Sequence, residues 1–111
     1  MKFYYVYILE CSDKSFYIGV SSNLERRMQE HNEGIKKDAY TFSRRPVVLK
    51  WMEMFTSPEQ AIAIEKKLKG WSRRKKIALI NEDWDKLIAY SKNYTQYGKY
   101  GGEEGSSTSS D

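Results

Sequence analysis

Glu65 is a carboxylate in a position where an apolar side chain is expected. It belongs to a stripe with helical i, i+3, i+4, i+7 spacing, whose other members are Ala61, Ile64 and Leu68. Burying a carboxylate carries a penalty on the order of several kcal/mol unless a cation, hydrogen bonds or a metal ion compensates. Glu65 therefore predicts either a metal site or a buried ion pair with an arginine. With one cysteine and one histidine in the chain, a metal here would be a hard cation bound by oxygen.

Two further pairs of polar residues are brought together by their spacing. Tyr7 and Tyr17 lie on strand-like segments and share a sheet face if the loop between them has an odd number of residues. Arg27 and His31 lie one helical turn apart. Taken singly, each also has a structural interpretation, because tyrosines pack sheets and a single helical histidine is often part of a core.

The elements that position these residues begin with a hairpin. Phe3 to Glu10 and Phe16 to Val20 read as two antiparallel strands. The sequence Ser22-Asn23-Leu24-Glu25 predicts a capping box, followed by a helix over about 23–32 that stops at Gly34. Leu24 and Met28 share the face of Arg27 and His31 and are expected to pack against the sheet.

The second half of the chain reads as one strand and three helices. A polar loop over 35–45 and Pro46 precede a strand from Val47 to Phe55. A capping box at Ser57 opens a helix that runs to about Leu68, Ser72 caps the next one, and Trp84, Leu87 and Ile88 mark a last short helix. Trp71, Ile77, Ala78 and Ile80 are the expected anchors of the third helix. The predicted order β-β-α-β-α-α-α is an α+β sandwich with a small three-stranded antiparallel sheet flanked by helices.

Size and composition predict one folded domain over residues 1–94. The 111 residues suffice for one modest core, and residues 95–111 read as a disordered Gly/Ser-rich acidic tail. No apolar run approaches the ~20 residues that span a bilayer, and the N-terminus lacks the features of a signal peptide. A lone Cys11 excludes an internal disulfide and suits a reducing compartment, so we expect a cytoplasmic protein without membrane association.

Basic residues outnumber acidic ones, which favours a polyanionic partner. The formal net charge is +4, and seven of the eleven residues from Lys66 to Lys76 are basic. A solvated helix face is an equally good explanation of such a run. The predicted nucleic-acid-binding residues are Lys36, Lys37, Arg44, Arg45, Lys69, Arg73, Arg74, Lys75 and Lys76.

The spaced set of motifs resembles the GIY-YIG nuclease family. It consists of Tyr5-Val6-Tyr7, Tyr17-Ile18-Gly19, Arg27, His31 and a helical Glu65. The stretch YIGVSSNLERRMQEHN is a close match, and the resemblance covers roughly residues 3–80. The small stand-alone bacterial members, the UPF0213-like type, are most similar, and they share the LKGWSR region. Tyr5 replaces the first glycine of the family's name, which we interpret as a subfamily mark.

The resemblance implies metal-assisted hydrolysis of phosphodiester bonds, in DNA rather than RNA. Glu65 would hold one divalent cation, Mg²⁺ or Mn²⁺. Tyr7 would act as general base, helped toward the phenolate by the positive charge of Arg27, which would also contact the phosphate. His31 would hydrogen-bond the phosphate, the water or Tyr7, and Tyr17 would complete the hydroxyl network. Gly19 would keep the sheet surface open for close approach.

Several points stay open from the sequence alone. Family enzymes carry a late asparagine near the site, and Asn81 is the nearest residue, although its spacing does not align cleanly. No obligate protein partner is indicated. Low sequence specificity or recognition of DNA shape is expected, with DNA repair or recombination as a setting, because phosphate contacts carry no sequence information. The alternatives are a non-catalytic nucleic-acid-binding module and a sheet that stacks single-stranded bases on Tyr5, Tyr7 and Tyr17.

Overall fold

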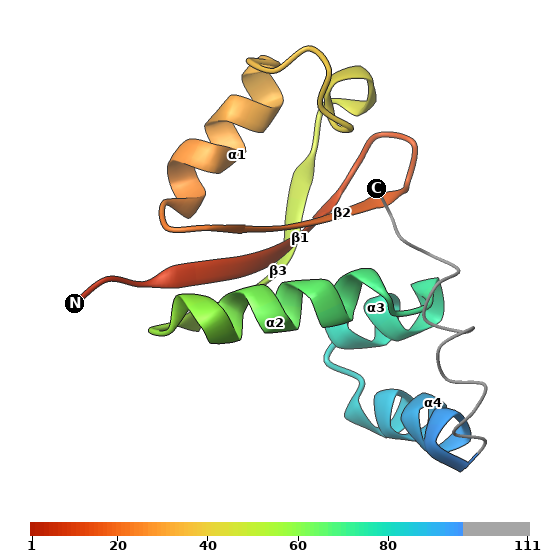
Figure 1. Cartoon of the computed structure of the whole chain (residues 1–111). Coiled ribbons are helices and arrows are strands. Elements are labelled where there is room, and N and C mark those ends of the chain that lie inside the picture. The colour runs from red at the N-terminus through yellow and green to blue at the C-terminus, as the bar shows by residue number, and fades with distance from the viewer. Residues whose placement is uncertain (97–111) are drawn as a thin grey trace. The chain divides into compact units, whose positions relative to one another are not determined.

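A computed structural model describes residues 1–96, with side chains up to residue 91. Its elements confirm the predicted α+β fold and the predicted order (Figure 1). They are β1 (Tyr4–Glu10), β2 (Phe16–Ser21), α1 (Leu24–Glu33), the 3₁₀ turn η1 (Phe42–Arg44), β3 (Val48–Phe55), α2 (Pro58–Lys69), α3 (Arg73–Ile80) and α4 (Trp84–Gln96). The last helix is longer than expected, and from residue 97 onward the predicted tail lies outside the described residues.

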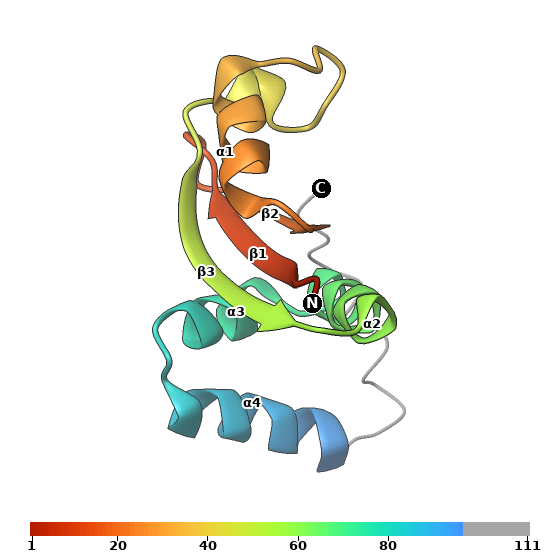
Figure 2. The same cartoon turned by 90° about the vertical axis from the view of Figure 1, so that its left-hand side faces the viewer.

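The sheet has the strand order β2-β1-β3, and both pairs are antiparallel (Figure 2). Tyr7 pairs with Gly19 and Leu9 pairs with Tyr17 across the hairpin. Because side chains alternate along a strand, this register places Tyr7 and Tyr17 diagonally on one face, as predicted. The hairpin thus brings the first two candidate residues together.

Helix α1 covers that face of the sheet (Figure 1). Leu24 and Met28 pack against the buried cluster that includes Tyr7 and Leu9, as their spacing predicts. The predicted capping box is wrong in one respect: Asn23, and not Ser22, is the N-cap, and its side chain accepts a hydrogen bond from Arg26 N at 3.0 Å. Asn23 has the extended backbone that an N-cap requires and an oxygen acceptor of the right reach.

The helix ends at Gly34, as expected. Gly34 adopts the left-handed conformation with φ 70°, and its N–H donates to carbonyl oxygens of the last helical turn. Few residues other than glycine adopt this backbone without strain, so Gly34 allows the chain to leave α1 sharply.

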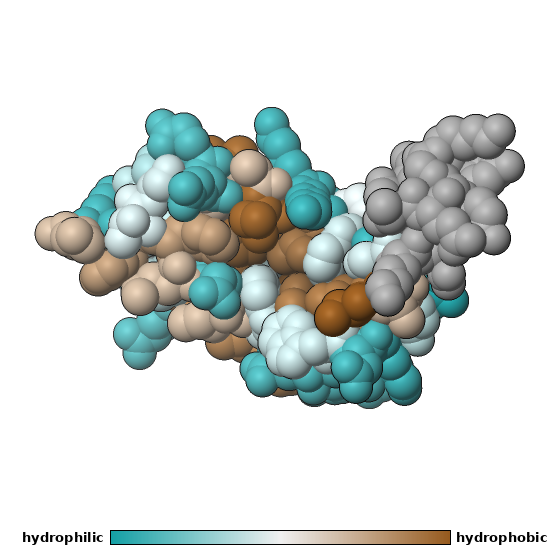
Figure 3. Space-filling model, turned by 90° about the horizontal axis from the view of Figure 1, so that it is seen from below, coloured by the Kyte–Doolittle hydropathy of each residue, from teal (hydrophilic) through white to brown (hydrophobic). Residues whose placement is uncertain are grey.

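Strand β3 is one edge of the sheet, and most of its residues are exposed. Between Ile8 and Leu9 of β1 the register shifts, because β3 carries one extra residue there, Lys50, which forms a β-bulge. Val48, Met52 and Met54 of β3 are exposed. Apolar and polar side chains are interspersed on the face of the molecule in Figure 3.

The chain forms two compact units, and the boundary falls within α2, after Glu65. Helix α2 begins as predicted, with Pro58 in its first turn and Ser57 Oγ accepting a hydrogen bond from Gln60 N at 3.2 Å. The second unit contains the last residues of α2, together with α3 and α4. Within the described part of the chain, no helix is both long and apolar enough to cross a membrane.

The burial of α3 differs from the prediction. Ser72 caps it as expected, accepting from Lys75 N, but Ile77 is 38% exposed, whereas Lys75 and Lys76 are 4% and 1% exposed. The Lys75 ammonium lies over the Trp71 ring at 4.5 Å. A lysine has a long apolar stem that can be buried like a hydrophobic side chain, which a pattern based on residue class does not anticipate.

Candidate active site

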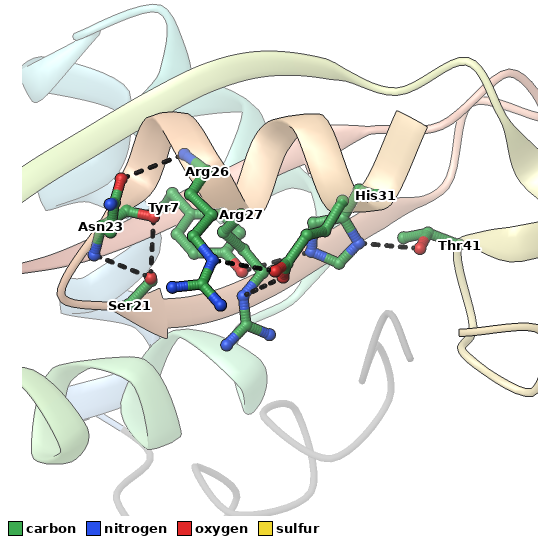
Figure 4. Close-up of polar contacts among 8 residues, drawn as sticks. Tyr7, Ser21, Asn23, Arg26, Arg27, His31 and Thr41 are labelled. Atoms are coloured by element: carbon green, nitrogen blue, oxygen red, sulfur yellow. Dashed lines mark hydrogen bonds and ion pairs between the residues drawn. The ribbon is translucent and has the colours of Figure 1, made fainter. Parts of the chain in front are cut away.

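His31 is the centre of a buried polar chain in the first unit (Figure 4). Its Nε2 atom lies 3.3 Å from the Tyr7 hydroxyl oxygen, and its Nδ1 atom lies 2.9 Å from Thr41 Oγ1. Tyr7 and Thr41 are each 1% exposed. Strand β1, helix α1 and the loop before η1 each contribute one residue, so three separate segments fix the imidazole ring between two hydroxyl groups.

Tyr17 lies against the same histidine. The ring centroids of Tyr17 and His31 are 5.2 Å apart with an edge-on geometry, and those of Tyr7 and Tyr17 are 6.4 Å apart. Tyr40 stacks on Tyr17, with centroids 6.3 Å apart. The burial of Tyr7 removes it from the base-stacking alternative, because a ring that is 1% exposed cannot present its face to a nucleobase, whereas Tyr5 and Tyr17 are half-buried.

Arg27 and His31 line a pocket of about 110 Å³, and Thr41, the other partner of His31, lines it too. Tyr17, Glu30 and Lys36 also line it. Arg27 forms an ion pair with Glu30 at 3.6 Å on the same helix and remains about one-third exposed. A guanidinium in this position can exchange a surface carboxylate for a phosphate oxygen, since exposed ion pairs contribute little stability.

The environment favours the uncharged forms of both Tyr7 and His31 by shifting their pKa values. Burial, followed by the neighbouring Tyr17, raises the pKa of Tyr7 above its ordinary value, and Arg27 only partly opposes this. Burial, aided by Arg27, lowers the pKa of His31. The charge of Arg27 favours a Tyr7 phenolate, as expected, but in the protein alone the pKa of Tyr7 is still raised, because desolvation outweighs the attraction of one partly solvated cation.

Glu65 lies within electrostatic reach of Tyr7. Its negative charge contributes to the raised pKa of Tyr7, and its side chain is half-buried on α2 between the buried residues Ala61 and Leu68. The described residues contain no cluster of three or more His, Cys, Asp or Glu side chains. One carboxylate nevertheless fits Mg²⁺, which keeps several water ligands and is often held by one carboxylate together with substrate phosphate.

Arg44 and Arg45, which the sequence assigns to nucleic-acid binding, make contacts within the chain. The Arg44 guanidinium lies 3.8 Å from the Tyr40 ring centroid and forms an ion pair with Asp13 at 3.0 Å. Arg45 Nε donates to Phe42 O at 2.7 Å. These arginines therefore stabilise the loop after α1, and any phosphate would have to compete with these partners.

The other basic residues fall into three groups. Lys36 and Lys37 are exposed in the first unit, while Lys69, Arg73 and Arg74 belong to the second unit. The burial of Lys75 and Lys76 is at odds with a role in direct phosphate contact. Asn81 is the C-cap of α3 in the second unit.

Sequence reasoning missed Thr41 and Tyr40. Both lie in the segment that reads as a polar loop, where no periodicity indicates burial. Only the folded structure shows that Thr41 contacts His31 and that Tyr40 stacks on Tyr17.

Gly19 provides the space that the Tyr7 hydroxyl occupies. A Cβ atom at this position would lie 2.5 Å from Tyr7 Oη and 2.7 Å from Tyr7 Cζ. We expect Gly19→Ala to destabilise the protein by about 1–3 kcal/mol, because the buried ring has no free space to move into. Urea unfolding would measure this. In a Tyr7→Leu background, which lacks the colliding atoms, the cost should shrink, and an equal cost in both backgrounds would refute this origin.

The stability of the protein should fall as the pH drops below about 6.5. The unfolded chain protonates His31 near that value, whereas the folded protein has a lower pKa, so the unfolded state takes up the proton first and gains stability. Arg27 and Lys36 lower this pKa and Glu30 raises it. The pKa of Asp13 is also lowered, by hydrogen bonds from Ser15. Protonation of that carboxyl changes the stability of the protein only below about pH 4, outside the range in which His31 titrates.

Urea unfolding of the wild type and His31→Gln between about pH 5 and pH 8 tests this dependence. The free energy of unfolding of His31→Gln should vary less over this range. Equal slopes for the two proteins would show that another group causes the acid sensitivity.

This chain is similar in sequence and fold to known proteins. The model of the family described as the GIY-YIG catalytic domain matches residues 3–78. A UPF0213 protein of Syntrophus aciditrophicus (strain SB) is 46% identical over 83 residues, which are 75% of this chain and 95% of that protein. One from Staphylococcus haemolyticus is 46% identical over 79 residues, 71% of this chain and 95% of that protein. An E. faecalis protein with a solution NMR structure is 35% identical in sequence to this chain. The two structures match with a TM-score of 0.53, over 74% of this chain and 86% of that one.

Proposed function

This chain belongs to the GIY-YIG catalytic domain family, as its motifs predict, and from that membership we propose that it is an endonuclease that hydrolyses DNA phosphodiester bonds. The observation that carries the proposal is the hydrogen bond between Tyr7 and His31 beside a pocket lined by Arg27. A buried acid–base pair next to an arginine is suited to hydrolysis of a phosphate ester.

Each residue then has a definite task. Arg27 binds the phosphate and stabilises the charge that develops on its oxygens. When the substrate brings the attacking water to the Tyr7 hydroxyl, which is buried in the protein alone, Tyr7 accepts a proton from that water while passing its own proton to His31 Nε2. Tyr7 passes its proton on because burial makes a phenolate unfavourable. Tyr17 packs edge-on against the imidazole and restricts its orientation.

We further propose that Glu65 holds one Mg²⁺ or Mn²⁺ ion in the working enzyme. A half-buried carboxylate within electrostatic reach of Tyr7 supports this assignment. When bound, such a cation neutralises charge on the phosphate and on the leaving oxygen. A carboxylate is required because it is a hard, anionic ligand that these cations prefer.

The expected substrate is DNA that is recognised by its shape rather than by its sequence. Exposed lysines such as Lys36 and Lys37 would contact phosphates, which position the duplex without reading its bases. Selectivity for nicks, flaps or branches would suit a cytoplasmic role in DNA repair or recombination.

A cleavage assay on linear, nicked, flapped and branched DNA, and on matched RNA, tests the proposal. Cleavage should require Mg²⁺ or Mn²⁺ and should disappear when EDTA is added. Salt-sensitive binding without cleavage on every substrate would instead identify a nucleic-acid-binding module.

A further inference from the structure

Thr41 is a buried residue whose hydroxyl contacts the candidate acid–base pair. Its Oγ1 atom lies 2.9 Å from His31 Nδ1, on the side of the ring away from Tyr7 (Figure 4). Although Thr41 precedes the 3₁₀ turn η1, its side chain makes no capping hydrogen bond there. The contact with His31 is therefore the polar interaction that the structure gives for this hydroxyl.

The positions of both partners are fixed by backbone hydrogen bonds. The Thr41 carbonyl accepts from Arg44 N at 3.0 Å, and the His31 carbonyl accepts from Gly34 N at 3.3 Å. Both side chains are buried. The distance between Nδ1 and Oγ1 thus depends on two anchored segments and not on mobile side chains.

The network favours one tautomer of His31. A neutral imidazole has one N–H and one acceptor nitrogen. If Nε2 carried the proton, the Tyr7 hydroxyl proton would need a second acceptor, although Tyr7 is 1% exposed. If Nδ1 carries it, Nδ1–H donates to Thr41 Oγ1 and the Tyr7 hydroxyl donates to Nε2, so both nitrogens are satisfied. The Thr41 hydroxyl proton then has water in the pocket as an acceptor, because Thr41 lines that pocket and Tyr7 is not among its lining residues.

We propose that Thr41 is a positioning residue that holds His31 as the Nδ1–H tautomer, so that Nε2 accepts the Tyr7 proton during hydrolysis. This inference rests on the proposed function. As the water oxygen bonds to phosphorus, a water proton moves to Tyr7 Oη and the Tyr7 proton moves to Nε2. His31 ends as an imidazolium that still donates from Nδ1 to Thr41, and the bond from phosphorus to the leaving oxygen breaks with its electron pair on that oxygen.

Two substitutions distinguish the effect of the Thr41 hydroxyl group from the effect of the shape of its side chain. Thr41→Val keeps the branched side chain and removes the hydroxyl, whereas Thr41→Ser keeps the hydroxyl. We expect Thr41→Val to lower kcat about 10- to 100-fold, the usual cost of losing a group that orients a functional histidine, with little change in KM. Thr41→Ser should recover most of the activity.

Nitrogen-15 NMR of the single histidine provides a readout that does not depend on cleavage. The wild type near pH 7.5 should show a protonated Nδ1 and an unprotonated Nε2, as should Thr41→Ser, while Thr41→Val should show a mixture of tautomers. A wild type in the Nε2–H form would overturn the proposal without any variant. It would also be overturned if Thr41→Val kept both the wild-type tautomer and the wild-type kcat.

The two proposals can fail separately. A wild type that never cleaves refutes the proposed endonuclease, and the NMR spectra still decide whether Thr41 sets the tautomer. A wild type that cleaves, with a kcat and a His31 tautomer that Thr41→Val leaves unchanged, refutes the role of Thr41 alone.

Discussion

Tyr7→Phe is expected to lower kcat by about 10²- to 10⁴-fold, the usual contribution of a positioned acid–base group. Phenylalanine fills the same buried site but removes the hydroxyl that contacts His31. Neither the transfer of a proton from water nor its passage to Nε2 is then possible. Because Arg27 is unchanged, DNA affinity should stay near that of the wild type.

The measurement is single-turnover cleavage with saturating protein, together with a binding titration. Tyr4→Phe is the matched control, because Tyr4 lies on the same strand and makes no contact with His31 among the described interactions. Urea unfolding should show a loss of about 1 kcal/mol for Tyr7→Phe, the usual cost of one hydrogen bond. Cleavage by Tyr7→Phe at the rate of Tyr4→Phe would remove Tyr7 from the mechanism.

Glu65→Gln should reduce cleavage by roughly 10³-fold or more. The charge stabilisation that a bound cation supplies is worth several kcal/mol, and each ~1.4 kcal/mol changes a rate tenfold. Glutamine keeps the size of the side chain but removes the negative charge that would hold the cation. Raising the Mg²⁺ concentration should restore part of the activity if the loss is one of cation affinity.

Glu59→Gln is the matched control on the same helix, since Glu59 is exposed in the first turn of α2. Titration with Mn²⁺ followed by electron paramagnetic resonance measures cation binding without cleavage. Binding should weaken in Glu65→Gln and stay unchanged in Glu59→Gln. If both variants bind Mn²⁺ as the wild type does, Glu65 is not the metal ligand.

The sequence predicts those parts of the site that depend on local periodicity. Alternation along β1 and β2 places Tyr7 and Tyr17 on one face, and helical spacing places Arg27 beside His31. Both relations follow from backbone geometry within a single hairpin or helix. These two relations therefore do not depend on how the rest of the chain folds.

The remaining features depend on contacts between distant segments. Thr41 is ten residues from His31 in an irregular loop, so no repeat predicts their hydrogen bond. The choice of Asn23 over Ser22 as N-cap depends on which residue has the extended backbone and the side-chain oxygen in reach of Arg26 N, and that residue is Asn23. The protonation state of Tyr7 depends on burial, which is a property of the whole fold and not of the residues near it in sequence.

The register of the hairpin also limits which insertions between β1 and β2 are compatible with the site. Five residues separate β1 from β2, in a loop with an exposed tip where insertions would usually be tolerated. If one residue is added and the pairing shifts with it, every side chain of β2 moves to the opposite face, and Tyr17 and Gly19 leave His31 and Tyr7. A one-residue insertion should therefore preserve the site only where the loop absorbs it and Tyr7 stays paired with Gly19 and Leu9 with Tyr17.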